Sequence, residues 1–224
     1  MPSVIGKNNL RSRVALGINN HIFYGWIMTA LAGLGYFASG PAQSHTFSVF
    51  IGPLSRDLDL SRTEISSAYG IATFAAAFFL PVVGRVLDRL GARQTGHGIA
   101  ILLGASCFLF SLVPGGIWLA IGFAALRFSG QGALMLTSAN LVSQWFDQKR
   151  GFALSLMALG FSLSMAVHPN LADWLIQLVG WRQAWVWLAL ATWAILAPAF
   201  LLLAFDQPEN LGLRPDGAEI RESE

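Results

Sequence analysis

Long apolar runs separated by short polar connections dominate the hydrophobic pattern of this chain. A helix that crosses a bilayer needs about 20 mostly apolar residues, and six of the runs reach that length. The pattern therefore predicts an all-α membrane protein with six transmembrane helices. These are expected over residues 21–53, 65–86, 94–113, 117–145, 151–179 and 181–205.

The segments outside the apolar runs complete the expected organisation. Residues 1–20 form a basic N-terminal arm, and residues 206–224 form a polar tail in which we expect little regular structure. The first run is too long for the core of a signal peptide, so it is interpreted as a retained span. It is also long for one crossing, which predicts a tilted helix, and Gly40-Pro41 weakens its backbone hydrogen bonds.

The composition agrees with a bilayer as the natural solvent. Hydrophobic residues make up 54% of the 224 positions and charged residues only 12%, against about 25% in soluble domains. The single cysteine, Cys107, excludes an intrachain disulfide and a cysteine-based metal cluster. Nucleotide-binding glycine loops, zinc spacings and nucleophile elbows are absent from the sequence. We therefore expect no enzyme activity, no metal, no cofactor and no nucleic-acid partner.

The positions of the basic residues orient the expected spans. The N-terminal arm, the stretch 84–93 around the second connection, the fourth connection and the tail together hold ten Lys and Arg residues. The connections on the other side hold three, and Arg127 lies within a span. Because cytoplasmic loops are enriched in Lys and Arg, both termini are predicted to be cytoplasmic, in a cell (inner) membrane.

Arg127 is the sharpest candidate for chemistry inside the membrane. It lies about ten residues into its run, or roughly 15 Å along a helix. A guanidinium there stays protonated and needs a partner or a wet cavity. It either balances the charge of an anionic substrate or clamps backbone carbonyls of another helix. Gln131 and Ser138, at i+4 and i+11, share its helical face, which favours a wet surface.

Two further spans carry polar side chains. The stripe in the first span favours a cavity wall over simple helix packing, and it consists of Tyr36, Ser39, Gln43 and Thr46. In the fifth span, Ser164 and His168 share a face. Because histidine side chains ordinarily titrate near neutral pH, His168 is a candidate for proton coupling, but a hydrogen-bonded histidine beside Pro169 is the favoured interpretation.

Three more expectations follow from the same pattern. His45 lies off the stripe of the first span and is expected to be interfacial or hydrogen-bonded. Arg182 is expected to pair with Asp173 near the outer surface. The segments 90–94 and 179–183 resemble each other three spans apart, as an inverted three-plus-three repeat would produce, although chance similarity explains them equally well.

The connection after the second span carries a dense motif, Gly84-x-Val86-x-Asp88-Arg89-x-Gly91-x-Arg93. It resembles the signature loop of the major facilitator superfamily in residue order, position and side of the membrane. That resemblance implies that Gly84, Asp88, Arg89, Gly91 and Arg93 form a cytoplasmic latch, whose charges hold two halves of a transporter together.

Further segments extend the resemblance over almost the whole chain. Residues 127–132 are similar to the arginine motif of the fourth span, with the Gln-Gly pair one place later than usual. Residues 145–151 resemble the loop into the fifth span, and the antiporter motif of that span is degraded. The segments 24–26, 40–44 and 208–217 look most like the monocarboxylate and oxalate–formate branch.

The resemblance implies a secondary carrier that moves a small organic anion, a monocarboxylate or dicarboxylate, by alternating access. Symport and antiport, with or without protons, both stay open. Members of the superfamily have two six-span halves, so we expect a partner half in the lipid bilayer, from the same gene product or a separate chain. The alternative is a non-transporting membrane scaffold or assembly partner derived from a carrier.

Overall fold

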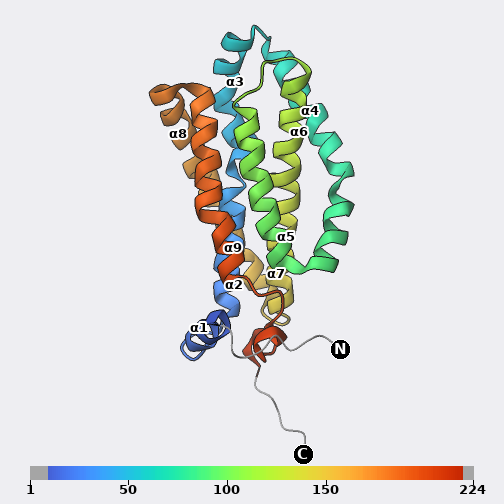
Figure 1. Cartoon of the computed structure of the whole chain (residues 1–224), viewed down its shortest axis with the longest axis vertical. Helices are drawn as coiled ribbons and strands as arrows, with labels where there is room; N and C mark the ends of the chain where they lie inside the picture. The colour runs from blue at the N-terminus through green and yellow to red at the C-terminus, as the bar shows by residue number, and fades with distance from the viewer. Residues whose placement is uncertain (1–9, 219–224) are drawn as a thin grey trace, which may run out of the picture.

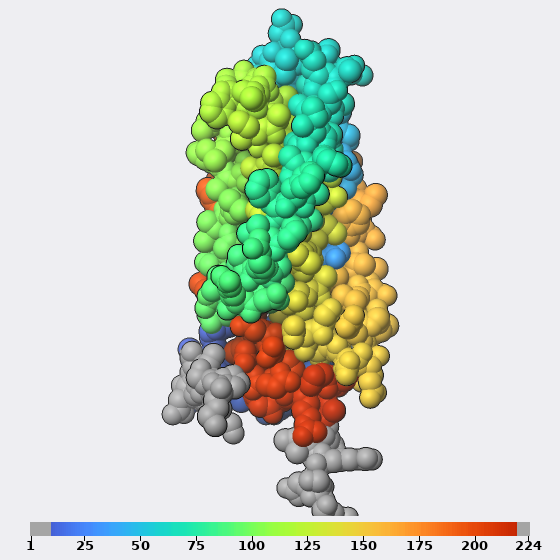
Figure 2. Space-filling view, turned by 90° about the vertical axis from the view of Figure 1, so that its right-hand side faces the viewer, coloured from blue at the N-terminus to red at the C-terminus, as the bar shows by residue number. Residues whose placement is uncertain are grey.

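The computed structural model describes residues 10–218 as an elongated bundle of helices (Figure 1). No strand occurs in this range, which confirms the all-α prediction for it. The first helix, α1 (Leu10–Asn19), and the last two helical turns, η4 (Pro208–Leu211) and η5 (Pro215–Gly217), lie at the same end of the bundle. Figure 2 shows the face on which α4 (Arg62–Phe78) crosses the bundle obliquely.

The remaining elements follow one another with few residues between them. They are α2 (Gly25–Ala38), the 3₁₀ turn η1 (Gly40–Ala42), α3 (Ser44–Leu58), α5 (Leu80–Phe110), α6 (Ile117–Leu126), the π-helical segment η2 (Arg127–Leu134), α7 (Met135–Trp145), α8 (Arg150–Ala191), a second π-helical segment η3 (Thr192–Leu196) and α9 (Ala197–Leu203). The first apolar run is thus a helix broken at the Gly40-Pro41 pair.

Two helices of the described residues are long and apolar enough to cross a membrane. They run over Ile117–Trp145 and Arg150–Leu203, with 29 and 54 residues. The pair α4 and α5, bent by 42° at its junction, makes a third if it is taken as one span. Both α5 and α8 contain an internal break, so their lengths overstate any single straight helix.

The breaks lie at two glycines with nearly the same backbone conformation. Gly91 has φ 78° and ψ 169°, and Gly180 has φ 81° and ψ 162°. Positive φ of this kind is readily adopted only by glycine. At each, the chain turns back along the bundle (Figure 1). The charged stretch 84–93 was expected to form a connection. In the structure the helix continues to Leu90, so the connection is shorter than expected.

An arginine stands two residues after each of these glycines. Arg93 binds the C-terminal end of the helix that contains Arg182, and Arg182 binds the C-terminal end of the helix that contains Arg93. The Arg93 Nε donates to the Leu201 carbonyl oxygen at 3.0 Å, near the end of α9. The Arg182 Nη1 donates to the carbonyl oxygens of Ser111 (3.1 Å) and Val113 (3.0 Å), just after α5. A cation at a helix C-terminus is favourable because backbone carbonyls point there. The two antiparallel helices therefore exchange the same contact at both ends.

The prediction that Arg182 pairs with Asp173 is wrong. Its Nη2 lies 3.0 Å from the Asp57 carboxylate at the end of α3, and Asp57 also accepts a hydrogen bond from the Trp181 indole at 3.2 Å. Asp173 instead accepts from Gln177, one turn further along α8. The turn at Gly180 carries Arg182 away from the exposed face of α8 on which Asp173 lies.

The tail is more ordered than expected over 206–218, while 219–224 lie outside the described residues. The carboxylate of Asp216 accepts hydrogen bonds from the backbone amides of Asp147 (3.0 Å), Gln148 (2.7 Å) and Lys149 (3.1 Å). Burial alone raises the pKa of Asp216, but these bonds, with the Lys149 charge, outweigh it and lower the pKa below its ordinary value. The tail is thus fastened beneath the start of α8.

Glycines allow α2 and α8 to approach closely. A Cβ at Gly160 would overlap the carbonyl of Gly33. We expect Gly160→Ala to destabilise the chain by about 1–3 kcal/mol because the two backbones must separate. Thermal unfolding in detergent checks this. Gly70→Ala is the matched control, since nothing lies within 4 Å of its Cβ position. An equal unfolding temperature for both variants would contradict the packing.

The Asp216 contacts give a second prediction. Replacing Asp216 by Ala removes hydrogen bonds to a charged acceptor, so amide hydrogen exchange at 147–149 should speed up by about tenfold or more at pH 7. Because the folded pKa is lowered, the stabilisation is present at neutral pH and is lost as the pH falls through that lowered value. Glu209→Ala, at an exposed position of the same tail, should leave these exchange rates unchanged.

Candidate functional site

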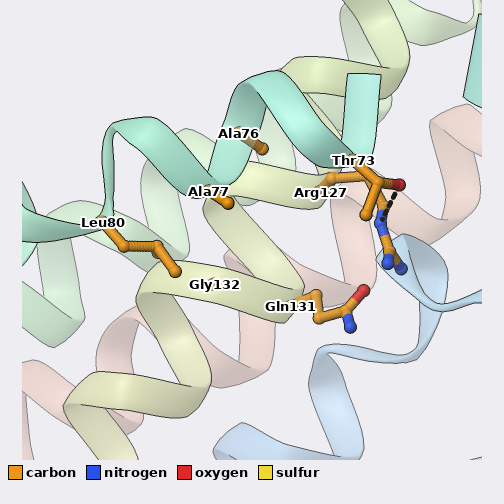
Figure 3. A pocket seen from close by; sticks show the side chains of 7 residues that line it. All are labelled: Thr73, Ala76, Ala77, Leu80, Arg127, Gln131 and Gly132. Carbon is orange, nitrogen blue, oxygen red and sulfur yellow. Dashed lines mark hydrogen bonds between the residues drawn. The ribbon is translucent and has the colours of Figure 1, made fainter. Parts of the chain in front are cut away.

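Arg127 lies near the middle of the continuous helix α6–η2–α7, and it connects that helix to two others. Its side chain is only 8% exposed. The Nε donates to the Thr73 Oγ1 of α4 at 2.9 Å (Figure 3), and the Nη1 donates to the Ala42 carbonyl oxygen of η1 at 3.1 Å. The guanidinium carbon lies 4.8 Å from the centre of the Tyr69 ring. The carbonyl clamp considered from the sequence is therefore present.

The clamp leaves the charge of Arg127 without a counter-charge. A hydroxyl, a carbonyl and an aromatic ring surround it, and no carboxylate of residues 10–218 lies within 4 Å of its nitrogens. Buried charges in proteins are normally paired, because removing an ion from water costs several kcal/mol. An arginine held in place by neutral groups is suited to receive an anion.

An open pocket with a volume of about 200 Å³ lies beside Arg127. It is lined by Thr73, Ala76, Ala77, Leu80, Arg127, Gln131 and Gly132. Figure 3 shows the Gln131 amide and the Arg127 guanidinium projecting to the same side of η2. The lining combines an apolar wall with one cation and two hydrogen-bonding side chains, which is the composition typical of small-molecule sites.

The π-helical segment η2 explains a departure noted in the sequence. A π turn accommodates one more residue than an α turn, and such segments often occur at functional sites. This agrees with the Gln-Gly pair standing one place later than usual. The wider turn also rotates the residues that follow it. Ser138 is buried against Gly35 of α2 and does not line the pocket. Arg127 and Gln131 are brought together, and Ser138 is not.

The polar stripe of the first span gathers around the break at η1. The Ser39 hydroxyl donates to the Tyr36 carbonyl at 2.8 Å, and the Gln43 amide donates to Ser39 Oγ at 3.0 Å. The Tyr36 ring is half-buried. Thr46 is fully buried, and its hydroxyl has no hydrogen-bond partner within the described residues. Much of the stripe thus bonds locally to the broken helix, and none of it lines the Arg127 pocket.

His168 packs against Gly40, two residues before the Ala42 carbonyl that Arg127 binds. Its Nδ1 lies 3.1 Å from Ser164 Oγ, and the same oxygen lies 3.3 Å from the Nε2 of His45. The ring packs against Phe37, with 4.6 Å between ring centres, and against Gly40, where a Cβ would overlap it. His45, which the stripe left out, therefore joins His168 through Ser164.

The five residues that the resemblance assigns to a latch differ in their contacts. The Arg93 backbone amide donates to the Asp206 carboxylate at 2.7 Å, and Gly91 lies against the same carboxylate. Asp88 and Arg89 are exposed, and neither makes a hydrogen bond or an ion pair within the described range.

Two features of the latch region were not expected from the resemblance alone. Gly84 is half-buried and has open space at its Cβ position. Asp88 lines an open pocket of about 220 Å³ that also contains side chains from α7 and the tail, namely Asn140, Gln144 and Gln207. Of these five residues, Gly91 and Arg93 thus contact Asp206, Asp88 and Arg89 are exposed, and Gly84 is half-buried.

Thr73 and Tyr69 are the site residues that the sequence did not point to. Both lie on α4 and contact Arg127 only because α4 packs against α6 and η2. In the sequence, a threonine and a tyrosine among apolar residues give no signal of this kind. Their spacing of one helical turn places them on one face, but nothing in the pattern indicates which helix that face meets.

A helical bundle with two helices apolar enough to cross a membrane is typical of an integral membrane protein, and comparison with known families gives the particular class. The model of the Major Facilitator Superfamily matches residues 23–222, so the chain belongs to that superfamily. It is therefore an integral membrane protein of a transporter family and not an enzyme. The resemblance drawn from the loop motif is confirmed.

Three curated relatives illustrate the similarity. A hexuronate transporter of Escherichia coli (strain K12) is 29% identical over 164 residues, covering 72% of this chain and 37% of the relative. The uncharacterised MFS-type transporter YhjX of the same organism is 28% identical over 181 residues, 79% of this chain and 44% of the relative. An uncharacterised 38 kDa protein of Thermoproteus tenax is 27% identical over 186 residues, 82% and 48%. The chain spans less than half the length of each.

The different environments of Gln131 and Ser138 can be tested by thiol labelling. In a Cys107→Ser background, Gln131→Cys should react readily with a hydrophilic maleimide, because position 131 is exposed at the pocket. Ser138→Cys should react about tenfold more slowly or less, because a buried thiol is shielded from the reagent. Similar rates at both positions would show that the pocket does not distinguish them.

Proposed function

We propose that this chain is the N-terminal half of a secondary carrier that moves a small organic anion, a monocarboxylate or dicarboxylate, by alternating access. The observation that carries the proposal is the buried Arg127, held by neutral groups at the edge of a pocket. Membership of the superfamily supports transport of a small solute. The relative named as a hexuronate transporter supports an anion, since a hexuronate carries a carboxylate.

The proposed topology has six crossings, with both termini in the cytoplasm of a cell (inner) membrane. The breaks at Gly91 and Gly180 support the count, because each separates two helices inside one long element. The ten-to-three distribution of basic residues supports the orientation. Two observations support an inverted three-plus-three repeat. Gly91 and Gly180 have similar backbone conformations, and Arg93 and Arg182 each bind carbonyls at the end of the helix that contains the other arginine.

We also propose that the chain works with a second six-span half, from the same gene product or a separate chain. The coverage of its relatives supports this, and so do Asp88 and Arg89, which are exposed and make no hydrogen bond or ion pair with residues 10–218. Charges at a surface are inexpensive to pair and to release. The proposed latch would close when these two side chains meet the second half and open when the halves separate.

Arg127→Ala tests the function. In proteoliposomes containing this chain with its partner half, uptake of radiolabelled glucuronate, lactate and oxalate should be measured. We expect at least one anion to be transported. The variant should lose about 30-fold or more in kcat/KM, as expected when a hydrogen-bonded charge worth about 2 kcal/mol is removed. Insertion yield and elution in gel filtration should stay unchanged.

Arg62→Ala is the matched control, since Arg62 is exposed at the start of α4. It should transport as the unsubstituted protein does. Undiminished transport by Arg127→Ala would remove the anion role of that residue. Absence of transport of any anion, combined with failed assembly of the variant, would favour the alternative of a membrane scaffold.

A further inference from the structure

Resting on the proposed carrier function, we propose that Gln131 determines the specificity of the Arg127 pocket, and that the site selects acids with a hydroxyl group on the carbon next to the carboxylate. Three polar side chains line the pocket, namely Thr73, Arg127 and Gln131. They differ in how many of their hydrogen-bonding groups the protein already uses, and this difference gives each a separate role.

The Thr73 hydroxyl makes two hydrogen bonds within the protein. It donates to the Tyr69 carbonyl oxygen at 2.8 Å, and it accepts from the Arg127 Nε at 2.9 Å. A hydroxyl has only one proton to donate, so Thr73 has none left for an anion. Thr73 is therefore a positioning residue that holds the guanidinium in place.

The guanidinium of Arg127 retains donors at its outer edge. Its Nε is bound to Thr73, and its Nη1 donates to the Ala42 carbonyl oxygen. A guanidinium carries five N–H groups, so donors remain on Nη1 and Nη2. N–H groups in this planar arrangement match the oxygens of a carboxylate. The carboxylate of a ligand is thus assigned to this edge.

The Gln131 amide lines the pocket but makes no hydrogen bond within residues 10–218. A polar side chain inside a membrane-spanning helix needs a wet cavity or a polar partner. Figure 3 shows that this amide projects to the same side of η2 as the guanidinium of Arg127. A carboxylate bound at Arg127 therefore has the Gln131 amide beside it.

The spacing of these two side chains favours recognition of neighbouring groups on one small molecule. Side chains four positions apart on a helix have Cβ atoms about 5–6 Å apart. Their polar ends can therefore reach oxygens on adjacent carbon atoms. The rest of the lining offers no further polar side chain and consists of Ala76, Ala77, Leu80 and Gly132. Within this chain, the pocket thus reads a ligand at two points.

The chemistry of an amide favours a hydroxyl group at the second point. An amide and a hydroxyl each donate and accept, so they can pair in either orientation. A keto oxygen only accepts, and a methylene group does neither. An ammonium group would add a positive charge beside Arg127, where like charges repel strongly because the dielectric is low. The expected order of preference is 2-hydroxy acid, 2-oxo acid, unsubstituted acid and, last, 2-amino acid.

Four acids with the same carbon skeleton test this order, namely lactate, pyruvate, propionate and alanine. Their kcat/KM values are measured with radiolabelled compounds in proteoliposomes of this chain and its partner half. Oxalate is included as an anion without a hydroxyl group, and glucuronate as a larger hydroxy acid. Lactate should exceed propionate by about three- to tenfold, as expected for one hydrogen bond between neutral groups. Alanine should be transported least.

Gln131→Met removes the amide and keeps a side chain of similar length. It should lower kcat/KM for lactate until the ratio of lactate to propionate is about one, while the value for propionate stays within about twofold. Gln131→Glu should lower the uptake of every acid by about tenfold or more, because a carboxylate beside Arg127 competes with the ligand. The matched control is Gln183→Met, because Gln183 is also exposed but does not line the pocket. It should keep the full preference for lactate.

Equal kcat/KM values for lactate and propionate in the unsubstituted protein, or uptake confined to oxalate, would refute the selection and leave the carrier function intact. An undiminished preference in Gln131→Met would remove Gln131 as its cause. An equal loss for lactate and propionate in that variant would do the same, because it would show a role in structure and not in reading the hydroxyl group. Uptake of none of the six compounds would instead refute the carrier function, and the selection with it.

Discussion

The guanidinium of Arg127 joins three helices, and no carboxylate of residues 10–218 lies within 4 Å of its nitrogens to balance its charge. Hydrogen bonds to Thr73 and Ala42, and the ring of Tyr69, fix its position from α4 and from the broken first helix. These contacts satisfy its donors only in part and leave its charge uncompensated. A buried cation of this kind is costly for a purely structural role, and a pocket that also contains Thr73 and Gln131 lies beside it.

The break at η1 makes two contacts possible, one with Arg127 and one with His168. A continuous helix would use the carbonyl of Ala42 within its own backbone ladder, so the Gly40-Pro41 interruption makes that oxygen available to Arg127. The absence of a side chain at Gly40 lets the His168 ring approach. One local irregularity thus places a cation and an imidazole against the same short segment, from α6–η2–α7 and from α8.

The glycines at 91 and 180 organise the two ends of the bundle in the same way. Each reverses the chain, and each is followed by an arginine that binds carbonyls at the end of the neighbouring antiparallel helix. At one end this contact lies beside Asp206 and the docked tail, with Asp88 and Arg89 left exposed. At the other end, Asp57 completes the contact. The two ends therefore differ: Arg182 is paired with Asp57 at one end, whereas Asp88 and Arg89 are exposed at the other.

Apolar run length and the loop motif determined the helical class and the family, because these signals are local in sequence, and a single arginine within an apolar run made Arg127 a candidate site residue. Partners across helices could not be predicted in this way. Asp57 displaced Asp173 as the partner of Arg182, Ser138 turned away from Arg127 through the π segment, and His45 joined His168 through Ser164. Each depends on the rotation and bending of whole helices, which only packing against other helices decides.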